Sequence, residues 1–239
     1  CSAVDRLVRT LLVIELNLRV LLVSNTTFSR TCVMSGAENA PSGATQGTDR
    51  EQWRLELRAK TAHIWAQGPD AAPGSLDSTL KRNSAFIKRL RQGNIAESKD
   101  ALLREVWQLN LGKYLDELIP SIPEALWRST TVRDRHAVME VLVALHQRFG
   151  AEFSKPLSSA MAASFAPSSR ASMPELSNEQ REKDEVTRLA RQRVLIRGVT
   201  EYALVGLYGP PSDPLDVGAD GLEWLFMLLR ELVRIPCLY

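Results

Sequence analysis

The chain has 239 residues, of which 44% are hydrophobic and 24% are charged, and its formal net charge is +2. This length allows one large domain or two small ones, and the composition is that of an ordinary soluble protein. Because the net charge is nearly neutral, overall charge is excluded as a source of attraction to phosphate or acidic partners, and only local clusters can supply it.

The N-terminal third is expected to contain little of the folded domain. Residues 7–23 are apolar, but three charged residues interrupt them, and each would be costly at the centre of a bilayer, so we predict no transmembrane helix and no membrane partner. Residues 1–33 differ in character from the rest of the chain, and we interpret them as a non-native leader with Met34 as the true start. An Arg-bearing amphipathic targeting segment is the alternative.

Residues 34–75 are predicted to be a flexible region that contains one helical arm. Residues 35–49 are rich in Gly, Ser, Ala and Thr and cannot bury enough surface to offset the entropy of ordering, which predicts a disordered linker. Residues 49–67 carry Trp, Leu and Ile among charges and predict a helix with an irregular apolar stripe. We expect this arm to pack loosely and to end before Gly68.

The stretch from Leu76 to Leu90 predicts the first helix of a helical domain. At 3.6 residues per turn, four apolar residues and one asparagine fall on a narrow stripe, namely Leu76, Leu80, Asn83, Ile87 and Leu90. Asp77 and Ser78 stand where an N-cap would lie. A buried amide without a hydrogen bond costs about 1 to 3 kcal/mol, so we expect Asn83 to bond a backbone group of a neighbouring helix. A ligand contact is the alternative.

The opposite face of the same helix is basic. Its cations are Lys81, Arg82, Lys88 and Arg89, followed by Arg91. A run of charge is often only a solvated helix face. Few acids neutralise this one along the sequence, however, so we take it as a candidate binding face for RNA or for an acidic partner.

Helical periodicity continues to the end of the domain. Further helices are predicted over 98–109, 111–122, 131–149, a shorter stretch through Leu157 and Phe165, 178–208 and 222–232, with a mobile loop over 166–177. Pro120 and Pro123 should kink or stop the helix predicted over 111–122. Ser121 and Glu124 stand in capping-box positions from which a new helix could start. No strand alternation interrupts the pattern.

The segment 178–208 is too long for one ordinary helix, and we expect it to bend at Gly198. Arg193, Arg197 and Glu201 stand one turn apart on it, which predicts an internal ladder of ion pairs with a structural role. The whole pattern predicts an all-α fold of antiparallel helical pairs, each of about 40 to 50 residues, in a HEAT-like right-handed solenoid.

No spacing typical of catalysis occurs in the sequence. It contains no glycine-rich phosphate loop, no His-Glu-x-x-His and no Gly-x-Ser-x-Gly, so we predict no enzyme, no catalytic residues and no cofactor. The three histidines, His63, His136 and His146, are scattered and are interpreted as structural, with His136 facing solvent. Three cysteines near the chain ends show neither a disulfide framework nor a metal-ligand spacing, and they favour a reducing compartment.

Four segments resemble the first middle domain of the up-frameshift protein two family, the scaffold of nonsense-mediated mRNA decay, whose domains are of the initiation factor 4G middle-domain type. They are residues 76–90, 109–114, 146–149 and 193–208, and their order and spacing match that family. The resemblance covers 76–233, about two thirds of the chain. The proline pair departs from the family pattern.

The resemblance implies a non-catalytic scaffold that helps to assemble the mRNA surveillance complex with decay-complex proteins, in a cytoplasmic, perinuclear or shuttling location. It places the sites for the decay helicase and the exon-junction partner in other parts of the family's chains, so both are expected to be absent here. Because the family's domain continues through further helices, 76–233 is expected to be incomplete at its C-terminus, with 234–239 outside the domain.

Two other functions remain open from the sequence. One is an RNA-binding translation-initiation or cap-binding scaffold with the same type of domain, and the other is a helical enzyme subunit. RNA binding through several phosphates should weaken steeply with salt, whereas a packed protein interface should not.

Overall fold

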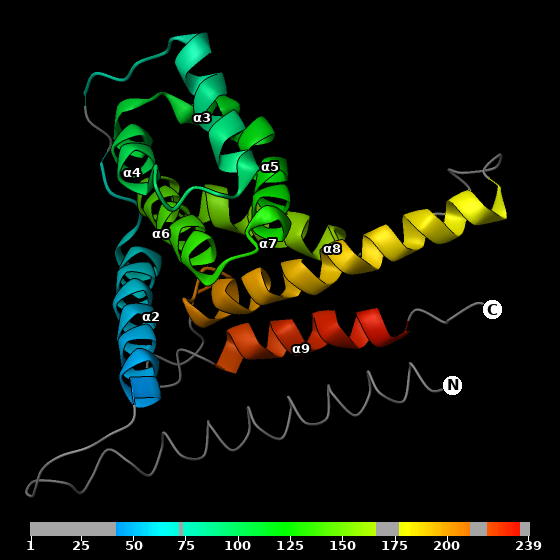
Figure 1. Ribbon diagram of the computed structural model, residues 1–239. Helices are drawn as coiled ribbons and strands as arrows, with labels where there is room; N and C mark the ends of the chain where they lie inside the picture. The colour runs from blue at the N-terminus through cyan, green and yellow to red at the C-terminus, as the bar shows by residue number, and fades with distance from the viewer. Residues whose placement is uncertain (1–41, 72–73, 166–176, 211–218, 235–239) are drawn as a thin grey trace, which may run out of the picture. The chain divides into compact units, whose positions relative to one another are not determined.

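The computed structural model describes residues 42–71, 74–165, 177–210 and 219–234, and the regular elements among them are helices joined by turns and loops (Figure 1). The chain divides into two units, 1–47 and 48–239. The elements are α2 (Ser42–Gln67), α3 (Leu80–Gln92), α4 (Lys99–Gln108), the 3₁₀ helix η1 (Leu111–Tyr114), α5 (Leu115–Arg128), α6 (Val132–Phe149), α7 (Ala151–Ala163), α8 (Asn178–Leu204) and α9 (Ala219–Arg234). The predicted all-α fold is confirmed.

Several predictions fall outside these residues. They concern the leader 1–33, Met34, most of the loop 166–177 and residues 235–239. Two boundaries inside the described part are wrong: the first helix starts at Ser42 rather than near Asp49, and Arg234 is the last residue of α9 rather than part of a tail. None of the described helices is both long and apolar enough to cross a bilayer.

Helices two places apart in the chain pack against each other. α3 packs on α5 and α4 on α6, while α5 also contacts α7 and α8, and α8 contacts α9. This is the arrangement expected when successive antiparallel pairs stack in two layers. The core between them is formed by side chains with no exposed surface, among them Leu102, Leu118, Ile122, Leu142 and Phe153.

α3, predicted over Leu76 to Leu90, starts at Leu80, four residues later than expected. Asp77 forms an isolated bridge with Leu109: its N–H donates to Gln108 O at 2.9 Å, and its carbonyl accepts from the N–H of Asn110 at 2.9 Å. This pairing draws Asp77 out of the helix, and Thr79 becomes the N-cap. The predicted cap at Asp77 and Ser78 is therefore wrong.

The later start also changes the buried stripe of α3. Leu80 now lies in the first turn and is 64% exposed, so its predicted place in the core is wrong. Phe86, which the predicted stripe omitted, has no exposed surface. The buried residues of α3 are Asn83, Phe86, Ile87 and Leu90.

The proline pair does not interrupt α5. The helix runs through Pro120 and Pro123 to Arg128, so the predicted stop and capping box are wrong. Each proline removes one backbone hydrogen bond, but Leu118, Ile122 and Leu126 are fully buried, and packing of this face holds the helix together. Ser121 donates its hydroxyl to Leu118 O at 2.6 Å instead of capping a new helix.

α8 likewise runs as a single helix through Gly198, where a bend was predicted. A Cβ at this position would lie 3.0 Å from Leu126 Cδ2. The absence of a side chain therefore lets α8 approach α5 closely, which is a packing role rather than a hinge.

α2 is tied firmly to the domain, contrary to the predicted loose arm. Leu57, Thr61 and Ile64 are buried, and the hydroxyl of Thr61 donates to Val205 O at 2.6 Å. The indole N–H of Trp65 donates to Gly206 O at 2.9 Å. These two donors satisfy carbonyls just beyond the C-terminus of α8, so α2 closes that end of the helix.

Candidate binding surfaces

The basic face of α3, comprising Lys81, Arg82, Lys88, Arg89 and Arg91, is partly neutralised. Three of its cations form ion pairs with acids from other segments: Arg82 with Asp77 at 2.6 Å, Arg89 with Glu105, and Arg91 with Glu124 at 3.0 Å. The expectation that few acids neutralise this face is therefore wrong, because these acids come from α4, α5 and the segment before α3.

Two lysines of this face remain available. Lys81 and Lys88 are exposed, and neither has an ion-pair partner in the described part of the chain. They lie about two turns, or roughly 10 Å, apart along α3. The uncompensated part of the basic face is thus narrower than its composition suggests.

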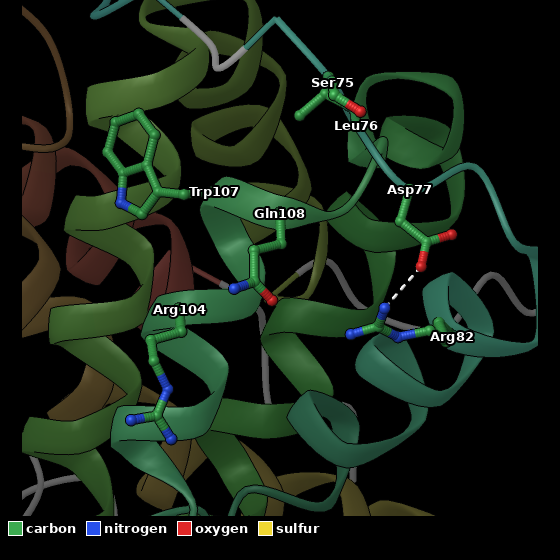
Figure 2. Close-up of a pocket in the computed structure, with 7 residues that line it drawn as sticks. All are labelled: Ser75, Leu76, Asp77, Arg82, Arg104, Trp107 and Gln108. Atoms are coloured by element: carbon green, nitrogen blue, oxygen red, sulfur yellow. Dashed lines mark hydrogen bonds and ion pairs between the residues drawn. The ribbon is translucent and has the colours of Figure 1, made fainter.

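A pocket of about 530 Å³ opens beside the N-terminal end of α3. Its lining is formed by Ser75, Leu76, Asp77, Arg82, Arg104, Trp107 and Gln108 (Figure 2). The Asp77–Arg82 pair lies on one side, and Arg104 and Gln108 of α4 lie on the other. Arg104 is exposed and has no ion-pair partner among the described residues, so the pocket extends the basic surface from α3 onto α4.

Asn83 has a structural role, although not the predicted one. Its amide donates to Thr79 O at 3.0 Å and to Asp77 O at 3.2 Å, so it secures the start of its own helix rather than a neighbouring helix. Its Oδ1 is buried without a partner. By holding the backbone of Asp77, Asn83 fixes one wall of the pocket.

The histidines occupy three different environments. His63 is exposed on α2, whereas His136 is half-buried and stacks on Trp53 with ring centroids 4.0 Å apart, so the prediction that His136 faces solvent is wrong. Burial lowers the pKa of His136. No group of His, Cys, Asp and Glu in the described residues could hold a metal ion.

His146 forms a pair with Ser154 that has the spacing of a base and a nucleophile. The Nδ1 atom of His146 lies 2.7 Å from Ser154 Oγ. Both side chains have no exposed surface, so no substrate can reach them. Burial also lowers the pKa of His146, which keeps the ring neutral, and the pair serves to satisfy polar groups in the core.

The predicted ladder along α8 is wrong. Glu201 pairs with Arg50 and Arg54 of α2, and Arg54 donates through Nε and Nη2 at 2.8 Å each. Arg193 and Arg197 are exposed and form no ion pair with Glu201. Glu201 faces α2, so its partners lie 147 and 151 positions away in the sequence, beyond the reach of spacing rules.

The chain is similar to known proteins both in sequence and in fold. No model of a known protein family matches the chain. The chain is 36% identical over 164 residues to "Nonsense-mediated mRNA decay protein 2" of Saccharomyces cerevisiae, covering 67% of this chain and 14% of that protein. It is 27% identical over 192 residues to "Regulator of nonsense transcripts 2" of Homo sapiens, covering 78% of this chain and 13% of that protein.

Two solved structures share the fold. One is the N-terminal mIF4G domain of Saccharomyces cerevisiae Upf2, with a TM-score of 0.57 and 30% identity, covering 77% of this chain and 60% of that one. The other is the first MIF4G domain of human UPF2, with a TM-score of 0.55 and 25% identity, covering 78% of this chain and 53% of that one. The chain thus spans a small part of the relatives and more than half of each solved domain.

Proposed function

We infer that this chain, which carries the first mIF4G domain of the Upf2 family of nonsense-mediated mRNA decay regulators, is a non-catalytic scaffold in the assembly of the mRNA surveillance complex. The observation that carries this proposal is the agreement of sequence and fold. The 36% identity to a yeast decay protein and the TM-score of 0.57 to a yeast Upf2 domain point to the same family. A cytoplasmic site of action accompanies this role.

Within this role, we assign partner binding to the basic face of α3 and the adjoining pocket. Lys81 and Lys88 supply exposed charge without a counter-ion, and Arg104 extends it across the pocket mouth. Trp107, which is half-buried, adds apolar surface that a partner side chain can cover. Charges at the rim steer association, and the apolar surface of Trp107 in the pocket helps to retain the partner. The occupant proposed here is a decay-complex protein.

The scaffold role is tested by deleting residues 48–234 from the protein in its own cells. The half-life of an mRNA with a premature stop codon should lengthen, while the same mRNA without that codon should be unaffected. Unchanged half-lives of both mRNAs, with the shortened protein present at normal abundance, would contradict the proposal.

The binding face is tested by the double variant Lys81→Glu and Lys88→Glu. Because neither lysine has an ion partner in the described structure, the free energy of unfolding should change by no more than about 0.5 kcal/mol. Capture of decay-complex proteins from a lysate of the same cells should fall by about tenfold at low salt, since steering charge is lost. Quantitative mass spectrometry of the captured proteins measures this.

The matched control reverses Lys60 and Lys113, two exposed lysines that do not line the pocket, and so changes the net charge by the same amount. Its capture of decay-complex proteins should equal that of the unaltered chain. If both double variants lose the same proteins to the same extent, the effect comes from net charge, and the α3 face has no specific role.

A further inference from the structure

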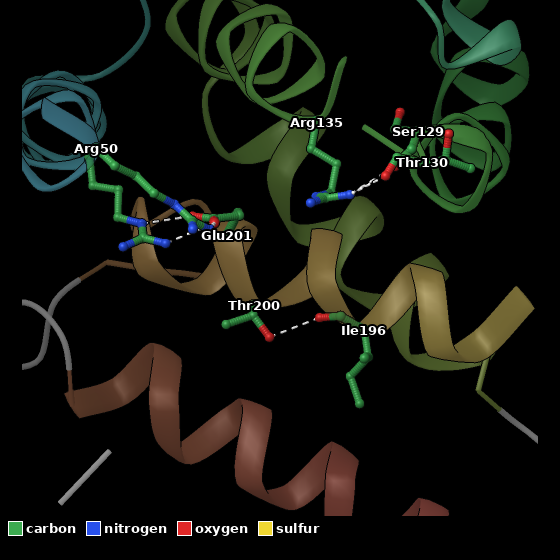
Figure 3. Close-up of polar contacts among 8 residues, drawn as sticks. Arg50, Ser129, Thr130, Arg135, Ile196, Thr200 and Glu201 are labelled. Atoms are coloured by element: carbon green, nitrogen blue, oxygen red, sulfur yellow. Dashed lines mark hydrogen bonds and ion pairs between the residues drawn. The ribbon is translucent and has the colours of Figure 1, made fainter. Parts of the chain in front are cut away.

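A second concentration of positive charge lies where α2, α6 and α8 meet, on different helices from the α3 face. Glu201 of α8 is 3% exposed and accepts a hydrogen bond from Arg50 of α2 (Figure 3). It also accepts hydrogen bonds from Arg54 of the same helix. These two arginines fully engage its carboxylate. Other arginines around the junction must therefore find a counter-ion elsewhere.

Arg135 is the first of these arginines. Its side chain extends from α6 and is 7% exposed, and Nη1 donates to Ser129 O at 3.2 Å and Thr130 O at 2.9 Å (Figure 3). Both acceptors are neutral carbonyls, and no carboxylate of the described chain forms an ion pair with it. A buried charge without a counter-ion is unfavourable, and the N-terminal end of α6 adds positive potential nearby.

Arg197 and Arg193 continue this charge along α8. They precede Glu201 by one and two turns, and both are exposed without an ion pair in the described structure. Arg197 lies near enough to Arg135 that, after burial itself, its charge is the main influence lowering the pKa of Arg135. Arg50 acts in the same direction as Arg197, whereas Glu201 and Asp134 act in the opposite direction. Among the ion pairs of the described residues, Glu201 is the one carboxylate that binds any of the five arginines at this junction, Arg50, Arg54, Arg135, Arg193 and Arg197.

We propose that Arg135, Arg193 and Arg197 form a docking site for an acidic segment of a partner polypeptide. A guanidinium binds a carboxylate through two parallel hydrogen bonds, so neighbouring arginines suit a run of Asp or Glu side chains. The bound carboxylates pair with the exposed Arg193 and Arg197, and their negative charge also offsets the charge of the buried Arg135 behind them.

Single-stranded RNA fits this junction less well. Its recognition relies on a row of cations along the backbone together with open aromatic faces on which bases stack. Trp53, the aromatic residue on the adjoining face of α2, is already stacked on His136 at 4.0 Å, and its Nε1 donates to Glu140 at 3.2 Å. Because the ring of Trp53 is already covered by His136, the three arginines favour a short acidic peptide over a nucleic acid.

The test measures binding of a fluorescent peptide of eight consecutive glutamates to the whole chain by anisotropy at low salt. The double variant Arg193→Glu and Arg197→Glu should weaken binding by about tenfold or more, because attraction is replaced by repulsion. Both residues are exposed and make no ion pair in the described structure, so circular dichroism and urea unfolding should stay unchanged.

The variant Lys60→Glu and Lys113→Glu is the matched control, because it changes net charge equally at two exposed lysines that belong to neither proposed binding surface. It should weaken peptide binding by less than about threefold. Equal losses in the two variants would overturn the proposal, since the peptide would then respond only to net charge. Tighter binding of a fluorescent 15-nucleotide uridine RNA than of the peptide, with the same sensitivity to Arg193→Glu and Arg197→Glu, would also overturn it.

Discussion

Replacing Glu201 by Gln is expected to lower the free energy of unfolding by about 3 kcal/mol, because removal of one partner strands charges in a buried network. The side chain of Glu201 is 4% exposed, whereas the side chains of Arg50 and Arg54 are 42% and 27% exposed. Both arginines can therefore be partly hydrated by water in the Glu201→Gln variant. For this reason the expected loss of unfolding free energy lies at the lower end of the range for buried ion pairs. Urea unfolding at pH 7 measures the change.

The same variant predicts a pH dependence. Burial alone raises the pKa of Glu201, but the hydrogen bonds and charges of Arg54 and Arg50 outweigh it and hold the pKa below the ordinary value of 4.5. A carboxyl with a lowered folded-state pKa stabilises the fold above its unfolded pKa, and this contribution is lost as the pH falls through the folded pKa. The stability difference between the chain and Glu201→Gln should therefore shrink below about pH 4.5.

Glu182→Gln is the control for both measurements, because Glu182 is exposed on the same helix and forms no ion pair in the described structure. Its unfolding free energy should stay within about 0.5 kcal/mol of that of the unaltered chain. A Glu201→Gln variant that matched this control at pH 7 would contradict the proposed anchoring of α2 by a buried carboxylate.

The elements that were predictable are those whose signals are local. α6 shows this best: Thr131 accepts from Asp134 N at 3.0 Å as its N-cap, Gly150 follows its last residue, and Val138, Leu142 and Leu145 form its buried stripe. Periodicity and caps depend on residues within a few positions of each other, so one sequence is enough to locate such a helix.

The errors arise where a distant segment decides the outcome. The neighbours of Asp77 favour a helix, but pairing with Leu109 removes Asp77 from it. The irregular apolar stripe of α2 predicts a loosely packed arm. In the structure, polar side chains, among them Arg54 and Thr61, provide much of the attachment of α2 to the C-terminal end of α8. Hydrophobic periodicity cannot register contacts of that kind.

The sequence was enough to predict which cations lie on the α3 face, but not which of them lack an ion-pair partner. The sequence identifies all five cations of the α3 face, yet Asp77, Glu105 and Glu124 pair with three of them. The pocket combines α3, α4 and the segment before α3, so its lining could not be assembled from spacing alone. Only the three-dimensional structure shows that Lys81 and Lys88 lack ion-pair partners among the described residues, whereas the three arginines have them.

Replacing Gly93 by Ala is expected to lower the free energy of unfolding by about 3 kcal/mol, from backbone strain and steric overlap together. Gly93 ends α3 with φ 74° and ψ −16°, a left-handed conformation that a side chain disfavours. A Cβ there would also lie 2.4 Å from Ala125 O and 3.0 Å from Ser129 N, both backbone atoms of the α5 end. The end of α3 would have to move away from α5.

That movement would also break a buried hydrogen bond, because the hydroxyl of Ser129 donates to Gly93 O at 2.8 Å. Gly68→Ala is the control that distinguishes backbone strain from steric overlap. Gly68 also has a left-handed φ of 91°, but a Cβ at this position would have no heavy atom within 4 Å. The Gly68 variant should lose only about 1 kcal/mol, the share due to the left-handed backbone. Equal losses in urea unfolding for the two variants would show that the close approach of α3 and α5 at Gly93 does not limit stability.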